Sequence, residues 1–134
     1  MNYCDVCYDR PQPMEFQVRL HFVEVDLRRK VWFSGDRALY TVTVYNRSSL
    51  PMERVVLSSG GAAFLDGSVR VNGLSEPEAD PVRGIEVPGL DAGGRVLVTW
   101  EEELRPGQTL SERPVRAAYA YRFDGRLRFG ETEG

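Results

Sequence analysis

The chain has 134 residues and a formal charge of −3, and 42% of its residues are hydrophobic and 28% charged. This length and composition fit one folded domain with its own core, not a disordered tail. The negative charge, with basic residues scattered among acidic ones, argues against nucleic acid as a partner, and no apolar run reaches the length of about eighteen residues that a membrane-spanning helix needs. We therefore expect no nucleic-acid partner and no membrane span.

The N-terminal part of the chain is predicted to be an extended connector, residues 1–14, ahead of a single β-sandwich domain, residues 15–134. Both cysteines, Cys4 and Cys7, lie in the connector, and no secretion signal is visible there. Two nearby prolines, Pro11 and Pro13, favour an extended segment that cannot continue a helix.

Alternating apolar residues begin directly after the connector. Phe16, Val18, Leu20 and Phe22 share one face of an expected strand. The alternation then changes phase at Val23, which is typical of a bulge or of a strand that crosses between two sheets. This segment is expected to be the first strand of the domain, and its pattern would also suit addition to a sheet edge of another copy.

The rest of the chain follows the period of two that is typical of strands. Polar and apolar residues alternate in six further segments, namely residues 39–46, 55–58, 68–72, 95–104, 115–123 and 127–129. Residues 73–84 are rich in proline, glycine and acidic residues and indicate a long connection of the Greek-key type. No segment has sustained helical spacing, so the predicted fold class is an all-β sandwich of about seven to nine strands.

Turn residues separate these strands. Asn72-Gly73 and Asp124-Gly125 are pairs of the kind that adopt positive φ in two-residue hairpins. Asn46 can bond back to the backbone and begin the turn that follows its strand. All five residues are predicted to have structural roles.

Four segments together resemble the conserved repeat domain of bacterial cell-surface proteins, namely residues 35–46, 64–73, 80–84 and 90–100. They contain, in order, Gly-Asp before a Tyr-Thr-Val-Thr-Val strand ending in Asn, a Gly-Ser-Val-x-Val-Asn-Gly strand, and a Gly-led Val-x-Val-Thr strand. The match extends over residues 31–104 with similar spacing. The resemblance implies an immunoglobulin-like Greek-key β-sandwich that serves as a spacer, stalk or adhesive module without catalysis.

A connector fastened to a neighbouring copy would turn a compact domain into a fibre. We therefore expect a non-enzymatic structural subunit of a bacterial extracellular or spore-surface fibre, with Cys4 and Cys7 in intersubunit disulfides. Its partners would be copies of itself, and other surface proteins are further candidates. Three other interpretations of the cysteines are a redox pair, half of a zinc site shared between chains, and free thiols in an inert tail.

A second hypothesis is a surface adhesion module that binds a glycan or a protein ligand. Exposed aromatic residues would be needed for such binding, and Tyr45, on an outward face, and Trp32 are the candidates. No catalytic, metal or cofactor site is predicted. The single histidine, His21, shares a strand face with Gln17 and Arg19, and a lone surface histidine is more often a bystander than a base.

Overall fold

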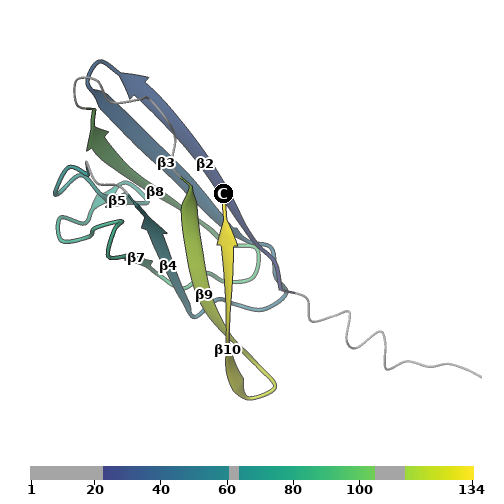
Figure 1. Cartoon of the computed structure of the whole chain (residues 1–134). Coiled ribbons are helices and arrows are strands. Elements are labelled where there is room, and N and C mark those ends of the chain that lie inside the picture. Colours follow the sequence, from purple (N-terminus) through teal and green to yellow (C-terminus); the bar gives the residue numbers. More distant parts are fainter. Residues whose placement is uncertain (1–22, 61–63, 105–113) are drawn as a thin grey trace, which may run out of the picture.

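The computed structural model describes residues 23–60, 64–104 and 114–134. Within these ranges the chain contains strands and turns and no helix (Figure 1). The strands are β2 (Val25–Ser34), β3 (Arg37–Asn46), β4 (Arg54–Ser59), β5 (Arg70–Val71), β6 (Leu74–Ser75), β7 (Ile85–Val87), β8 (Arg95–Glu103), β9 (Val115–Phe123) and β10 (Arg126–Glu133). The predictions for the connector and for Cys4, Cys7, Phe16, Val18, Leu20, His21 and Phe22 lie outside the described residues.

The strands form two antiparallel sheets that pack face to face. One sheet has the order β10-β9-β4-β7, and the other has the order β2-β3-β8-β5-β6. In chain order, successive described strands change sheet five times, between β3 and β4, β4 and β5, β6 and β7, β7 and β8, and β8 and β9. The predicted all-β architecture of two antiparallel sheets is confirmed.

Alternation along each strand determines which side chains enter the layer between the sheets. In β3, Tyr40, Val42 and Val44 are buried, whereas Thr41 and Thr43 lie between them on the opposite, partly exposed face. The same rule applies to the other long strands, and the largest fully buried side chains include Leu57, Ile85, Val98, Trp100 and Val115. The hydrophobic effect of this shared layer is the main force that holds the two sheets together.

Tyr40 and Trp100 form an aromatic pair inside this layer. The two residues are directly opposite each other in the β3–β8 ladder, and their rings are stacked with centroids 5.3 Å apart. Aromatic pairs of this kind contribute about 0.5–1.5 kcal/mol beyond the burial of their area. The pair therefore also helps to fix the register of the two central strands.

Two hairpins turn on pairs of residues in the left-handed region. Asn72 and Gly73 join β5 to β6 with φ of 50° and 82°, and Asp124 and Gly125 join β9 to β10 with φ of 57° and 74°. Positive φ at both central positions is the geometry of a type I′ turn, whose twist matches that of the flanking strands. Gly at the second position meets no steric penalty there.

Asn46 fastens two loops at one end of the sandwich. Its buried amide nitrogen donates to the carbonyl oxygens of Leu50 at 2.9 Å, Leu90 at 3.1 Å and Asp91 at 3.1 Å. Its amide oxygen accepts a bond from the backbone N–H of Ser48 at 2.9 Å, which forms the turn after β3. One side chain therefore links the β3–β4 connection to the β7–β8 connection.

Two strand lengths differ from those expected. The segment 68–72 yields only the short strand β5, because the turn at Asn72-Gly73 reverses the chain into β6 within the predicted long connection. The segment 127–129 is part of the much longer strand β10, which pairs with β9 along its whole length. The polar residues after Phe129 conceal this strand in the sequence, because both faces of most of β10 are exposed.

Candidate binding and assembly surfaces

The outer face of the β2–β3–β8 sheet carries the first candidate surface. The strand register places Asp26, Tyr45 and Arg95 in one row across the three strands. Residues directly opposite each other in an antiparallel sheet point to the same face, and this row points away from the core. Tyr45 thus lies on the outward face of β3.

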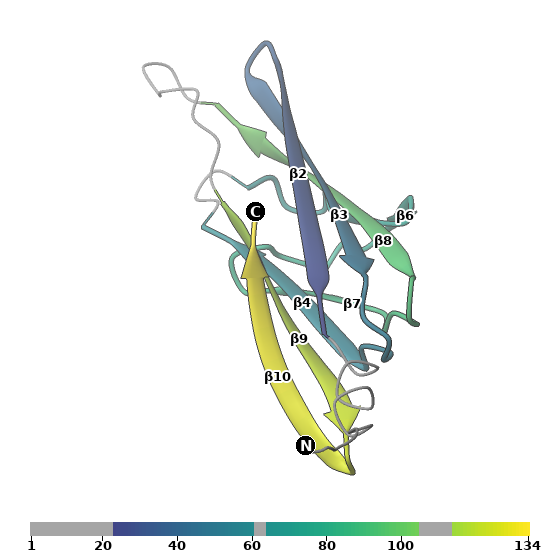
Figure 2. The same ribbon diagram turned by 90° about the vertical axis from the view of Figure 1, so that its right-hand side faces the viewer.

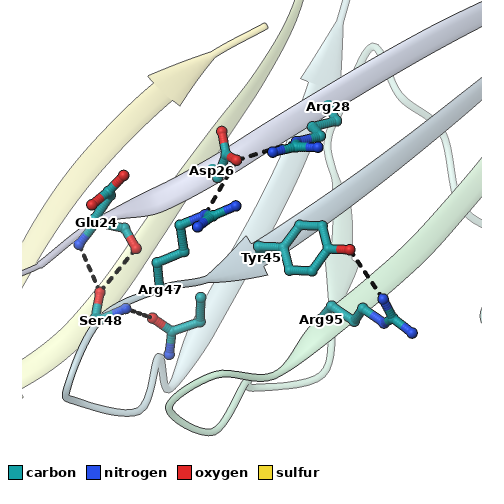
Figure 3. A network of polar contacts seen from close by, with 8 residues as sticks. Glu24, Asp26, Arg28, Tyr45, Arg47, Ser48 and Arg95 are labelled. Carbon is teal, nitrogen blue, oxygen red and sulfur yellow. Dashed lines mark hydrogen bonds and ion pairs between the residues drawn. The ribbon is translucent and has the colours of Figure 1, made fainter.

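Three guanidinium groups surround the ring of Tyr45 (Figure 3). The Cζ atoms lie 5.8 Å from the ring centroid for Arg28, 5.7 Å for Arg47 and 5.7 Å for Arg95. Arg95 Nη1 also donates a hydrogen bond of 3.0 Å to the Tyr45 hydroxyl. Cations within about 6 Å of an aromatic centroid are attracted by its quadrupole, so the ring organises the three side chains.

Asp26 is the carboxylate of this group. Its Oδ2 lies 3.3 Å from Nε of Arg28 and 3.3 Å from Nε of Arg47. Three guanidinium charges against one carboxylate leave a net charge of two positive units. We call these residues, Tyr45, Arg28, Arg47, Arg95 and Asp26, the Tyr45 cluster. The strand register, which composition does not reveal, thus gathers arginines that are scattered in the sequence.

Backbone bonds hold Arg47 beside β2. Its N–H donates to the carbonyl oxygen of Glu24 at 2.9 Å. The buried hydroxyl of Ser48 accepts from the N–H of Glu24 at 2.8 Å and donates to its carbonyl at 3.1 Å (Figure 3). The loop after β3 is therefore fixed to the residue just before β2, which places Arg47 against Tyr45.

Trp32 lies on the same outer face but far from Tyr45. Its side chain is 55% exposed, and the ammonium group of Lys30 lies 5.1 Å from its ring centroid. The row of Trp32 is six positions along β2 from the row of Tyr45, which is a distance of roughly 20 Å along the strand. The two aromatic candidates share a face and do not form one platform. Between them the face carries Thr41, Thr43 and Thr99.

Strand β10 provides the second candidate surface, because it is one of the two edge strands of its sheet among the described residues (Figure 2). Just beyond the end of β10, Gly134 exchanges two backbone hydrogen bonds of 2.9 Å with Val115 of β9. Counting back from Gly134, every second residue of β10 directs its N–H and C=O groups to β9 in the same way. The groups of the intervening residues point to the other side, which we call the open edge of β10. These residues are Leu127, Phe129, Glu131 and Glu133.

An apolar hollow lies beside this edge on the outer face of the sheet. Phe129 is 75% exposed and Leu127 is 43% exposed. Phe129 stands directly opposite Ala120 in the ladder, and the small side chains of Ala118 and Ala120 leave a depression of about 350 Å³ that Val56 also lines. We call this depression the alanine hollow. An apolar floor next to an exposed aromatic ring is typical of a protein contact site.

Ion pairs surround the alanine hollow. Arg54 Nε lies 2.8 Å from a Glu86 carboxylate oxygen, and this hydrogen bond is the main cause that raises the pKa of Arg54. Arg116 lies 3.9 Å from Glu131 and 3.8 Å from Glu133. An apolar centre with a charged rim is the usual anatomy of a surface that binds another protein segment.

On the inner face of the same hairpin, Gly130 makes room for Tyr119. A Cβ atom on Gly130 would lie 2.6 Å from atoms of the Tyr119 ring, so the ring covers the glycine closely. Burial of the phenol raises the pKa of Tyr119, and the neighbouring Tyr121 adds to this effect. The contact stabilises the hairpin and contains no group that points to catalysis.

Other classes of site were sought in the described ranges. No group of three or more His, Cys, Asp and Glu side chains there could hold a metal ion. No helix long and apolar enough to cross a membrane occurs in those ranges.

The comparisons with known proteins concern the fold. No protein-family model matches the sequence, and no curated protein matches it. Among solved structures, the chain is similar to BslA, a bacterial hydrophobin, with a TM-score of 0.60 and 12% identity over 81% of this chain and 90% of that one. It is also similar to GH20 exo-β-N-acetylglucosaminidase from Vibrio harveyi, with a TM-score of 0.50 and 16% identity.

The second similarity covers 81% of this chain and only 17% of the enzyme. At these levels of identity both similarities indicate a shared fold and nothing about activity.

Proposed function

We propose that the chain is a non-enzymatic structural subunit of a bacterial cell or spore surface that assembles with copies of itself. The observation that carries this proposal is the open edge of β10 with the alanine hollow beside it. An unpaired edge with exposed apolar side chains is a template for strand addition, which natural proteins usually cover or block. Here Phe129 is exposed at the edge, and within the described strand β10 neither proline nor a bulge interrupts it.

The proposal includes an immunoglobulin-like topology for residues 15–134. In that fold one sheet has the strand order ABED and the other has CFG. The order β2-β3-β8-β5 corresponds to ABED, and β10-β9-β4 corresponds to GFC, with β7 added beside β4. Support for a bacterial surface location comes from the similarity in fold to BslA, a bacterial hydrophobin, and from the repeat-like segments within residues 31–104.

In the proposed assembly, residues 16–22 of one copy add to the open edge of β10 in the next. Apolar residues alternate in that segment with the same period of two as Leu127 and Phe129 on β10. A head-to-tail contact produces a fibre when its rotation does not close the copies into a ring, and the proposed assembly is of this open kind. Cys4 and Cys7 in the connector, residues 1–14, would then form disulfides between neighbouring subunits.

The proposal is tested by measuring the mass of the full chain in solution by light scattering over a range of concentrations. We expect wild type to form multimers and Phe129→Lys to remain monomeric, because the added charge would have to be buried in the contact. Leu74→Lys is the matched control, since Leu74 is 70% exposed on β6 at the far edge of the other sheet. This control should assemble like wild type.

Glu131→Pro tests backbone pairing separately. Proline removes an N–H that points to the open edge and leaves the bonds between β10 and β9 in place. The variant should fold and fail to assemble. A monomeric wild type at about 100 µM, or two β10 variants that assemble normally, would disprove the proposal. Non-reducing electrophoresis of Cys4→Ser and Cys7→Ser then tests the disulfides, because a ladder that collapses on reduction should be lost in these variants.

A further inference from the structure

We infer that the Tyr45 cluster is a binding site for acidic polysaccharides, with the guanidinium groups around Tyr45 binding sugar carboxylates. This ligand site goes beyond the proposed assembly and lies on the other sheet. The cluster and the alanine hollow can therefore be tested independently.

The first argument is local charge. The whole chain carries a formal charge of −3, yet three guanidinium groups lie within 6 Å of one ring centroid, and two of them, Arg28 and Arg47, pair with the carboxylate of Asp26. Like charges placed side by side on a sheet repel one another. Binding of an anion would relieve the repulsion between the guanidinium groups around Tyr45. The excess of two positive charges therefore favours a negatively charged ligand.

The second argument is the set of available donors. Arg28 and Arg47 bind Asp26 through Nε, and their terminal nitrogens have no hydrogen bond to the described residues. Their side chains are 65% and 48% exposed. A guanidinium presents paired N–H groups in a planar fork that matches the two oxygens of a carboxylate. The chemistry of the cluster therefore suits carboxylates presented from solvent.

The third argument is preorganisation. The Tyr45 ring contacts all three guanidinium groups, and its hydroxyl is bonded to Arg95. Arg47 is further fixed by its backbone bond to Glu24. Donors that are already held in place lose less side-chain entropy when a ligand arrives. The ring is therefore a positioning group for the arginines, and its loss should weaken binding although the net charge is unchanged.

The shape of the surrounding face favours a chain of sugars. Lys30 lies two residues beyond Arg28 on the same face of β2, a step of roughly 7 Å, which continues the positive charge along the strand. The side chains of Thr41 and Thr43 lie on the outer face of the neighbouring strand, and exposed Trp32 lies further along. Hydroxyl and aromatic groups on an open face suit hydrogen bonding and stacking with sugar rings.

Nucleic acid is the competing polyanion. Its binding relies on many phosphate contacts from a broad basic surface. The cluster instead offers a few cations, with Asp26 among them and Glu101 in the same row as Trp32. An acidic polysaccharide with spaced carboxylates therefore fits this face better than a densely charged duplex does.

The test measures binding of a soluble polygalacturonate fragment to the full chain by calorimetry. The comparison ligands are neutral dextran and a short DNA duplex. We expect saturable binding of polygalacturonate that weakens with added salt, and no binding of dextran. The double variant Arg47→Gln/Arg95→Gln should reduce affinity about tenfold, a change that corresponds to about 1.4 kcal/mol. Arg122→Gln is the matched control, because Arg122 is a similarly exposed arginine paired with Glu53 at 3.1 Å on the opposite sheet.

Tyr45→Ala separates organisation from charge. It keeps every arginine, so a site that depends on charge alone would bind polygalacturonate as wild type does. We expect a loss of affinity close to that of the double arginine variant, and a smaller loss for Tyr45→Phe, which keeps the ring and removes only the bond to Arg95.

Four outcomes would overturn the inference: no saturable binding of polygalacturonate, equal binding of dextran, tighter binding of DNA, or unchanged affinity in both the arginine and the Tyr45→Ala variants. Repeating the polygalacturonate titration with Phe129→Lys, the variant expected to remain monomeric, separates ligand binding from assembly. Because Phe129 is on the other sheet, a monomeric variant that still binds shows that the two functions fail or succeed separately.

Discussion

Replacement of Asn46 by aspartate is expected to destabilise the sandwich strongly and in a pH-dependent way. The change keeps the size of the side chain and the acceptor for Ser48 N–H, but it removes the amide donor. Leu90 O and Asp91 O retain backbone donors from Met52 at 2.7 Å and Gly94 at 2.8 Å. Leu50 O loses the only hydrogen bond it has to the described residues.

The magnitude follows from these contacts. An unsatisfied buried carbonyl costs about 1–3 kcal/mol, and because Leu50 O is only partly buried we take the lower end, about 1 kcal/mol. A carboxylate at this buried position would also face three carbonyl oxygens, so its pKa should rise well above the usual value of about 3.9. The carboxyl avoids a buried negative charge if it binds a proton. At pH 7, which is about three units above the usual pKa, protonation costs about 1.4 kcal/mol per unit, or about 4 kcal/mol. We therefore expect Asn46→Asp to lose up to about 5 kcal/mol at pH 7.

The sign of the pH dependence is fixed by the direction of this shift. The introduced carboxyl has a higher pKa in the folded chain than in the unfolded chain, so its destabilising effect is smallest below the unfolded pKa of about 3.9. Stability is then lost as pH rises through the folded pKa. The difference between wild type and Asn46→Asp should shrink from about 5 kcal/mol at pH 7 to about 1–2 kcal/mol at pH 4.

Urea unfolding at these two pH values measures the effect. With an m-value of about 2 kcal/mol/M, the midpoint of Asn46→Asp should fall by about 2.5 M at pH 7. Asn72→Asp is the control, because Asn72 is exposed and an aspartate there can still accept the bond from Leu97 N–H that Asn72 accepts at 3.0 Å. It should change stability by less than about 0.5 kcal/mol. A midpoint for Asn46→Asp near that of wild type, or an equal loss at both pH values, would refute the reasoning.

Two further predictions concern the β9–β10 hairpin. Gly130→Val should destabilise the protein by about 1–3 kcal/mol, because its Cβ would lie 2.6 Å from the Tyr119 ring and the ring would have to move. Thermal unfolding measures this loss. An unchanged stability would mean that the ring does not cover Gly130 in solution. The phenol of Tyr119 should ionise at higher pH than an exposed tyrosine, because burial raises its pKa. Ultraviolet titration of wild type against Tyr119→Phe isolates this group, and an ordinary titration curve for it would contradict the burial.

Local chemistry explains which parts of the fold the sequence could predict. The hairpins at Asn72-Gly73 and Asp124-Gly125 depend on the φ preferences of adjacent residues, which the sequence states directly. The alternation around Tyr40 likewise indicates a buried face without knowledge of its partners. These features needed no information about contacts between distant segments.

The candidate surfaces depend on strand order, which residue patterns do not determine. Arg28 and Arg95 are far apart in the chain and meet only because β2 and β8 both pair with β3. The bonds from Asn46 to the loop at Leu90 likewise depend on how the sheets pack. The open edge of β10 was missed for a related reason, since a strand with exposed residues on both faces carries little hydrophobic alternation.

The placement of the two surfaces allows both proposals to operate in one molecule. The open edge of β10 belongs to one sheet (Figures 1 and 2), and the Tyr45 cluster lies on the outer face of the other, so the two surfaces share no residue. Assembly would then repeat the cluster along a fibre. Each exposed arginine contributes little alone, but repeated sites on a shared polymer gain affinity through effective concentration. Weak binding by one subunit would thus be sufficient for firm attachment of an assembled fibre to an acidic polysaccharide.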